Sequence, residues 1–200
     1  MTDLPLRTCS AFQGDARLAG GPLPDVALAV KAALVADPTA TILVFDDETG
    51  RAIDFDLRGT AEEIVARLAV PTAANATGQT EAPTERGRGR PRLGVVAREV
   101  TLLPRHWGWL AAQPGGASQA LRRLVEEARR TDGGRSRVRQ KQEAAYAFIS
   151  AMAGNREGFE EASRALFAGD AAGFTEHSRS WPDDIRSHAE NLAADALRAG

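Results

Sequence analysis

The first 70 residues alternate between strand-like and helix-like spacings of apolar positions. Four stretches have the alternating or β-branched pattern of strands, at residues 7–12, 16–19, 41–45 and 52–57. Apolar positions at helical spacing predict a helix from Asp25 to Asp37, and the capping-box pair Thr60 and Glu63 begins a second helix. The sequence therefore predicts a small α+β domain of order ββαββα over residues 1–70.

The C-terminal half of the chain has helical patterns almost throughout. Residues 71–85, rich in Pro, Thr, Ala, Gly and Glu, predict a flexible linker that continues to residue 94 through an Arg-Gly arm. Residues 135–200 predict a helical domain. Its four helices are expected to begin at Arg135, Asn155, Asp170 and Pro182.

Residues 95–134 combine a short alternating strand, a Pro-initiated helix, a Gly-containing turn and a Ser-capped amphipathic helix. This order resembles the ribbon-helix-helix family of DNA-binding proteins, in which two chains pair their strands into a ribbon that enters the major groove. The resemblance implies that Val100 and Leu102 point into the dimer core. The base-facing positions would be Ala97, Glu99 and Thr101.

The same resemblance assigns roles to the two helices. The backbone amides around Ala117, Ser118 and Gln119 would bind a phosphate at the start of the second helix. Six apolar residues would form the buried faces of the helices: Trp107, Leu110, Leu121, Leu124, Val125 and Ala128.

One base-facing position departs from the pattern of that family. Glu99 stands where polar or basic residues are usual, and a carboxylate can only accept a hydrogen bond there, as from a cytosine amino group. A strand register shifted by one residue would turn Arg98 outward instead. That shift would expose Val100 and Leu102, so both registers stay open.

The formal net charge of −2 conceals three segments of very different charge. Residues 1–85 carry 6 basic and 13 acidic groups, residues 86–141 carry 14 and 4, and residues 142–200 carry 5 and 10. A net charge of +10 in the middle segment is typical of a surface that binds phosphate groups or an acidic partner. Of the 25 basic residues 23 are Arg, which favours bidentate contacts with phosphate and guanine but is also typical of a GC-rich genome.

An Arg-Gly stretch precedes the predicted strand. Its core Arg88-Gly89-Arg90-Pro91 matches the AT-hook pattern, and Arg86 and Arg92 flank it. A slim, extended segment of this kind can place Arg groups in a narrow minor groove, where the negative potential is greatest. The alternative is a solvated Arg-Gly linker that does not contact DNA.

The chain also resembles, from end to end, the DUF2239 family of uncharacterised bacterial proteins. The most recognisable part runs from Gly89-Arg-Pro-Arg-Leu-Gly through Trp109-Leu110. This resemblance implies a bacterial cytosolic protein with a recurrent three-part layout, and it implies no particular activity.

Residues that could take part in catalysis are present but are not joined by any motif. They are His106, His177, His188, Cys9 and Ser118. The sequence has no Walker lysine loop, dinucleotide glycine fingerprint or Gly-x-Ser-x-Gly elbow. The acidic row Asp46-Asp47-Glu48 offers hard oxygen ligands for a cation but is more typical of a solvated turn. We therefore expect no enzyme, no cofactor and no metal site.

These patterns together predict a cytoplasmic DNA-binding protein, regulatory or accessory, that acts as a homodimer on duplex DNA. Its expected DNA contacts are Arg86, Arg88, Arg90, Arg92, Arg98, Glu99, Thr101, Arg105, Ser118 and Gln119. The acidic terminal parts would mediate dimerisation, effector sensing or contact with a protein partner. The alternative is a protein-interaction module, antitoxin-like or scaffold-like, whose basic centre docks on acidic protein surfaces. No apolar run approaches the ~20 residues needed to cross a membrane, so no membrane contact is expected.

Overall fold

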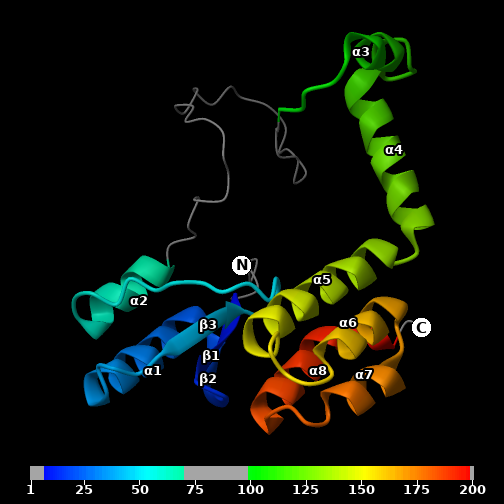
Figure 1. Ribbon diagram of the computed structural model, residues 1–200. Coiled ribbons are helices and arrows are strands. Elements are labelled where there is room, and N and C mark those ends of the chain that lie inside the picture. The colour runs from blue at the N-terminus through cyan, green and yellow to red at the C-terminus, as the bar shows by residue number, and fades with distance from the viewer. Residues whose placement is uncertain (1–6, 70–98, 199–200) are drawn as a thin grey trace. The chain divides into compact units, whose positions relative to one another are not determined.

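The computed structural model describes residues 7–69 and 99–198 (Figure 1). Within these residues the protein has one three-stranded antiparallel sheet and eight helices, which confirms the α+β fold class. The described residues form two compact units. One unit contains residues 7–69 together with 134–198, and the other contains residues 99–133.

The sheet is formed by β1 (Thr8–Gln13), β2 (Ala16–Pro22) and β3 (Ile42–Asp46). β1 lies in the centre, and both neighbours run antiparallel to it. A tight turn joins β1 to β2, and Gly14 in that turn has a φ of +59°, which favours glycine.

Both faces of β1 are buried, each against a different set of helices. Cys9 and Ala11 pack in one apolar cluster with Val26 of α1 (Leu23–Ala36). Phe12 points to the opposite face, because successive side chains of a strand alternate, and it belongs to a second cluster with helices from the C-terminal part. The central strand therefore connects two cores.

The predicted capping box at the start of α2 (Ala61–Ala69) is confirmed. The Thr60 N–H donates to the Glu63 carboxylate at 2.9 Å, and the Glu63 N–H donates to the Thr60 hydroxyl at 3.3 Å. These bonds satisfy two backbone N–H groups at the start of the helix, which would otherwise have no partner.

The predicted strand at residues 52–57 is wrong, and the order of elements up to residue 69 is ββαβα. Only an isolated bridge between Ala52 and Phe45 extends the sheet there. Arg67 donates to the carbonyl oxygens of Asp56 and Arg58 at 2.7 and 2.5 Å, which uses acceptors that a strand would offer to a neighbour. The alternating apolar residues of this stretch pack on the α1 side of the sheet without joining it; they are Ile53, Phe55 and Leu57.

The helical pattern predicted beyond residue 134 is confirmed. The four helices are α5 (Arg135–Met152), α6 (Phe159–Ala168), α7 (Ala171–Ser178) and α8 (Asp183–Leu197). Asp170 caps α7 by accepting from the Gly173 N–H at 2.9 Å. Asn155 does not cap α6, which begins after Gly158. A Cβ at Gly158 would lie 2.1 Å from the carbonyl oxygen of His177, so only glycine fits this junction.

Residues that the sequence assigned to two separate domains, 1–70 and 135–200, contribute to one core. Phe12 and Phe45 of the sheet lie 5.3 and 4.9 Å from Phe148 of α5, measured between ring centroids. Ile185 and Ala189 of α8 belong to the same cluster. Figure 1 shows α5 to α8 grouped next to the strands. The N-terminal sheet and the C-terminal helices therefore share one core and one compact unit.

The second unit contains a helical hairpin, α3 (Pro104–Ala111) and α4 (Gly116–Asp132). Pro104 stands at the first position of α3, where its missing N–H has no cost. Gly115 and Gly116 in the connection have φ values of +80° and +74°. The two helices of the predicted strand-helix-helix segment are thus confirmed.

Candidate nucleic-acid interface

The strand of the ribbon-helix-helix prediction falls partly outside the described residues, which resume at Glu99. Residues 99–103 have no regular secondary structure in the single chain. Leu103 has an extended backbone, with φ −65° and ψ 148°. Pairing of this stretch would require a second copy, so the ribbon stays a prediction.

The apolar faces of the hairpin are mostly exposed. Of the six residues predicted to be buried, Leu110 is 3% exposed, whereas Trp107, Leu124 and Val125 are 41%, 39% and 54% exposed. Ala120, which the prediction did not name, is 2% exposed. An eight-residue α3 is too short to cover the seventeen residues of α4. In the single chain the predicted burial is therefore confirmed for Leu110, and the exposed residues of the stripe would need a further surface to cover them.

Other apolar residues of this unit add to the exposed surface. Val100, Leu103 and Trp109 are 51%, 49% and 50% exposed. The hairpin consequently presents a large apolar area around a very small core.

The residues predicted to contact DNA are divided between described and undescribed parts of the chain. The five described ones are all exposed, at Glu99, Thr101, Arg105, Ser118 and Gln119. The other five lie outside the described residues, at Arg86, Arg88, Arg90, Arg92 and Arg98. Ser118 does not cap α4, because the helix begins two residues earlier at Gly116 and Gly115 occupies the cap position.

The start of α4 nevertheless has the properties of a helix end that suits an anion. No side chain caps it, and its first turn contains no acidic residue. Free N–H groups and the positive end of the helix dipole both favour a negative group there. Ser118 and Gln119 lie in this first turn, on the exposed surface.

The positive charge of the middle segment is spread over both units. Residues 99–133 contain five arginines and four acidic residues, so their net charge is only +1. Glu126 neutralises part of this charge, since Arg129 lies 3.5 Å from its carboxylate. Arg105 and Arg122 have no ion pair among the described residues. Four further cations begin α5, in the other unit, at Arg135, Arg137, Arg139 and Lys141.

A buried histidine of α8 packs against the sheet and α5. His188 is 5% exposed, and its ring packs 5.4 Å from Phe12 and 4.6 Å from Phe148. Its Nε2 atom has no hydrogen-bond partner among the described residues. Burial lowers the pKa of His188 below its ordinary value; the Asp47 carboxylate opposes this shift and Arg17 reinforces it.

The polar neighbours of this histidine form a short chain of hydrogen bonds. Arg17 Nη2 donates to the Ser10 hydroxyl at 3.1 Å, and that hydroxyl donates to Asp47 Oδ1 at 2.9 Å. His188 Nε2 lies 3.7 Å from the same carboxylate oxygen. Because the Ser10 hydroxyl is directed at Asp47, His188 is not placed to accept its proton, as a nucleophile–base pair would require.

The acidic row at residues 46–48 runs into a turn, as the sequence predicted, and Glu48 is exposed, but its first residue is buried. Asp46 is 2% exposed and accepts hydrogen bonds from Arg7 at 2.6 Å and from the Thr49 N–H and hydroxyl at 2.9 Å. Burial opposes its ionisation, yet these donors hold the pKa of Asp46 below its usual value. No group of three His, Cys, Asp or Glu side chains in the described residues is placed to hold a metal ion.

The lone cysteine is a packing residue of the sheet. Cys9 is fully buried, and burial together with the carboxylates of Asp47 and Asp46 raises the pKa of its thiol to about 12. A thiol in this state has almost no thiolate at neutral pH and is a poor nucleophile.

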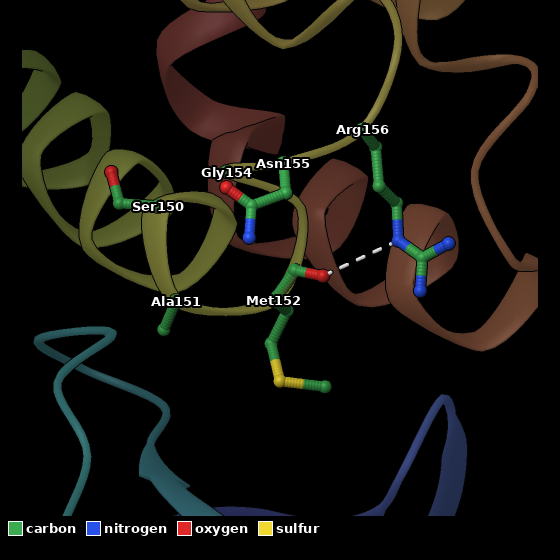
Figure 2. A pocket seen from close by; sticks show the side chains of 6 residues that line it. All are labelled: Ser150, Ala151, Met152, Gly154, Asn155 and Arg156. Carbon is green, nitrogen blue, oxygen red and sulfur yellow. Dashed lines mark hydrogen bonds between the residues drawn. The ribbon is translucent and has the colours of Figure 1, made fainter.

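A pocket of about 320 Å³ lies at the end of α5 (Figure 2). Its walls are formed by Ser150, Ala151, Met152, Gly154, Asn155 and Arg156. The Arg156 guanidinium donates to the carbonyl oxygen of Met152 at 3.4 Å and lies 2.5 Å from Asp15, so it links α5 to the β1–β2 turn. The pocket contains no acid–base pair that would suggest catalysis.

The described structure is that of a mainly helical α+β protein with a small antiparallel sheet. The chain belongs to a bacterial family described as "Uncharacterized protein conserved in bacteria (DUF2239)", which matches residues 8–193. This match confirms the resemblance noted in the sequence. No curated protein and no solved structure matches the chain. Among the described residues, no helix is long and apolar enough to span a membrane.

Proposed function

We propose that this protein binds duplex DNA as a homodimer, through the α3–α4 hairpin and the Arg-Gly stretch that precedes it. The observation that supports this most is the exposed apolar surface of the hairpin. Among the described residues of this unit only Leu110 and Ala120 are buried, and two helices with so small a core need a further surface to be stable. A covering surface is needed, and in the ribbon-helix-helix arrangement a second copy supplies it.

The start of α4 supports the phosphate contact in this proposal. Its uncapped N–H groups, near Ser118 and Gln119, would bind a backbone phosphate and fix the position of the dimer on the duplex. Glu99, Thr101 and Arg105 would lie nearest the bases or the adjacent backbone. Further contacts with phosphates or the minor groove would come from Arg86, Arg88, Arg90, Arg92 and Arg98. A cytoplasmic location belongs to the same proposal.

A second candidate is a protein-interaction module, antitoxin-like or scaffold-like. The low net charge of the described hairpin favours it, because a surface of +1 attracts phosphates weakly and its apolar residues suit a protein groove. In this case a different protein, and not a second copy, would cover the exposed apolar face of the hairpin.

A titration of the full-length protein with fluorescent random duplex of about 30 base pairs, at about 50 and 200 mM salt, separates the two candidates. Six phosphate contacts predict a loss of affinity of about a thousandfold between these salt concentrations. The double variant Arg105→Ala and Arg122→Ala should weaken binding. The matched control, Arg164→Ala with Arg179→Ala, removes the same charge from exposed, ion-paired positions in the other unit and should not.

Absence of duplex binding by the wild-type protein would refute the DNA proposal and leave the protein-interaction candidate. Equal losses in both double variants would mean that net charge alone, and not the hairpin, determines affinity.

A further inference from the structure

Three aromatic rings lie side by side on the surface of α5 and α6. The Tyr146 ring lies between Phe159, at a centroid distance of 6.3 Å and an angle of 29°, and Phe167, at 5.4 Å and 56°. Tyr146 and Phe167 are 41% and 50% exposed. The same unit has a core in which other aromatic residues are fully buried, so two adjacent exposed rings indicate a surface that another molecule covers.

Two side chains of opposite charge share the side of α5 on which Tyr146 lies. Helical spacing puts Arg139 within about 20° of Tyr146 around the helix axis, and Glu143 within about 60°. Both are exposed, and Glu143 is the sole acidic residue of α5. The same spacing puts Arg137 and Lys141 on the opposite side of the helix. The two turns before Tyr146 therefore add one cation and one carboxylate to the rings.

Arg139 and Glu143 are one turn apart, but they do not bind each other. Neither forms an ion pair among the described residues. An arginine that precedes a glutamate by four residues has the weaker orientation for such a pair. Arg164, Arg179 and Arg198, in contrast, each pair with a carboxylate three residues earlier. Both charged groups beside the rings are thus available to another molecule.

The surface that carries these groups is fixed in place. Gln142 donates to the carbonyl oxygens of Leu166 and Phe167 at 3.0 and 3.2 Å, which holds α5 against the end of α6. The contacts of Tyr146 with its two neighbouring rings join the same helices. A surface that is already ordered loses little conformational entropy when it binds a partner.

We propose that this surface, the ring face of Arg139, Glu143, Tyr146 and Phe167, binds the ring face of a second copy of the chain. In a twofold contact, every meeting of two residues occurs twice. With two antiparallel copies of α5 and the axis halfway between Arg139 and Tyr146, each Arg139 would lie level with Tyr146 of the other copy. Glu143 of that copy would lie about 5 Å away along the axis. The guanidinium could then bind the carboxylate and lie against the ring.

The ring face suits a second copy because its charges are complementary to themselves. A nucleic acid would bring phosphates close to Glu143, and an acidic protein would meet the same repulsion. Arg and Tyr are also enriched at the centres of protein interfaces. Stable interfaces involve about 20–30 residues on each side, which is more than the ring face offers. We therefore expect an association weaker than that of the hairpin and additional to it.

The proposal depends neither on duplex binding nor on the hairpin contact, so its test removes the hairpin contact first. The parent protein is the full chain with Leu124→Ser and Val125→Ser. Sedimentation equilibrium at rising protein concentration measures the self-association that remains. Tyr146→Ala combined with Phe167→Ala in this parent should weaken the association by about tenfold or more, because buried aromatic residues contribute most to such contacts.

Reversal of the two charges tests the twofold arrangement. In the same parent, Arg139→Glu and Glu143→Arg should each weaken self-association by about tenfold or more, since like charges would then face each other. The variant with both changes restores opposite charges and should associate like the parent. An equimolar mixture of the two single variants should also associate, because each supplies the charge that the other needs. Arg179→Glu, at an exposed and ion-paired position, is the control and should have no effect.

Three results would overturn the proposal. The first is a parent protein that stays monomeric at every concentration. The second is unchanged association in both single charge variants. The third is association that is lost in the single variants and restored neither by the double variant nor by the mixture, which would mean a contact of different geometry. A wild-type protein that self-associates in this way but does not bind duplex would overturn the proposed function alone.

Discussion

At the scale of single residues, Gly50 allows the N-terminal part of the chain to pack closely against α5. It has a φ of +64°, and a Cβ at this position would lie 1.8 Å from the carbonyl oxygen of Ala144 on α5. The turn around it is held by the buried carboxylate of Asp46 and cannot move away easily. The absence of a side chain at Gly50 is therefore required for contact between the sheet and α5.

We predict that Gly50→Ala lowers the free energy of unfolding by about 2 kcal/mol or more, from backbone strain and overpacking together. Gly14→Ala is the control, because Gly14 has a similar φ of +59° but open space around its Cβ position. It should cost only the strain, about 1 kcal/mol. Urea denaturation measures both values, and equal losses would show that the close approach to Ala144 does not exist.

The buried histidine predicts a pH dependence of stability. Since the pKa of His188 is lowered in the folded protein, the unfolded chain binds the proton more readily. The contribution of this residue is complete above the unfolded-state pKa of about 6.5 and is lost as the pH falls through the lower folded-state pKa.

His188→Phe removes the titrating group and keeps an aromatic ring between Phe12 and Phe148. Thermal melts between about pH 7 and pH 5 should show a smaller loss of stability on acidification in this variant than in the wild type. An equal loss of stability in the two proteins would mean that folding does not lower the pKa of His188.

How far a residue's role could be predicted depended on how local its partners are. The Thr60–Glu63 box and the Asp170 cap were predicted because all their atoms lie within three residues. Asp46 looked like part of a solvated turn because its burial and its bond from Arg7 come from elements distant in sequence. The sequence named His188 as a candidate but could not show its burial, because the rings that cover it, Phe12 and Phe148, are distant in sequence.

At the scale of elements, periodicity predicted the helices correctly and one strand wrongly. Apolar residues that recur at helical spacing over two or more turns line one face of a helix and no face of a strand. Residues 52–57 alternate as a strand does, but the same alternation also suits an extended segment that lays Ile53, Phe55 and Leu57 on an existing cluster. Period two reports which side chains face the core, and it does not report whether the backbone joins the sheet.

The apolar face of α4 leads to a prediction about association. Leu124→Ser with Val125→Ser should shift the protein from dimer to monomer, because both side chains are exposed in the single chain and would be covered by a second copy. Sedimentation equilibrium measures the shift. Val35→Ser, a comparable change at a residue 76% exposed on α1, is the control and should leave the association constant unchanged. A wild-type protein that is monomeric at high concentration would contradict this prediction.

At the scale of the whole molecule, the sequence suggested acidic end parts around a basic centre, whereas the structure joins the ends in one core. Composition and linker signals mark where the chain is polar, but they do not reveal which apolar faces meet. Cys9, Ser10, Ala11 and Phe12 are all buried in the structure, and a strand covered on both faces needs a layer on both sides. Only α1 and α2 are available nearby in sequence, so the second layer had to come from the C-terminal helices.

This shared core predicts that the sheet and the C-terminal helices unfold together. Phe148 contacts both Phe12 and Phe45, so Phe148→Ala should cost about 3–5 kcal/mol and lower protection from hydrogen exchange in β1 and α8 alike. Phe167→Ala is the control, since this ring on α6 is half exposed and its loss should cost much less. Exchange followed by mass spectrometry resolves the two segments. If α8 lost protection while β1 kept it, the sheet would be stable without the C-terminal helices, and the two segments would not unfold together.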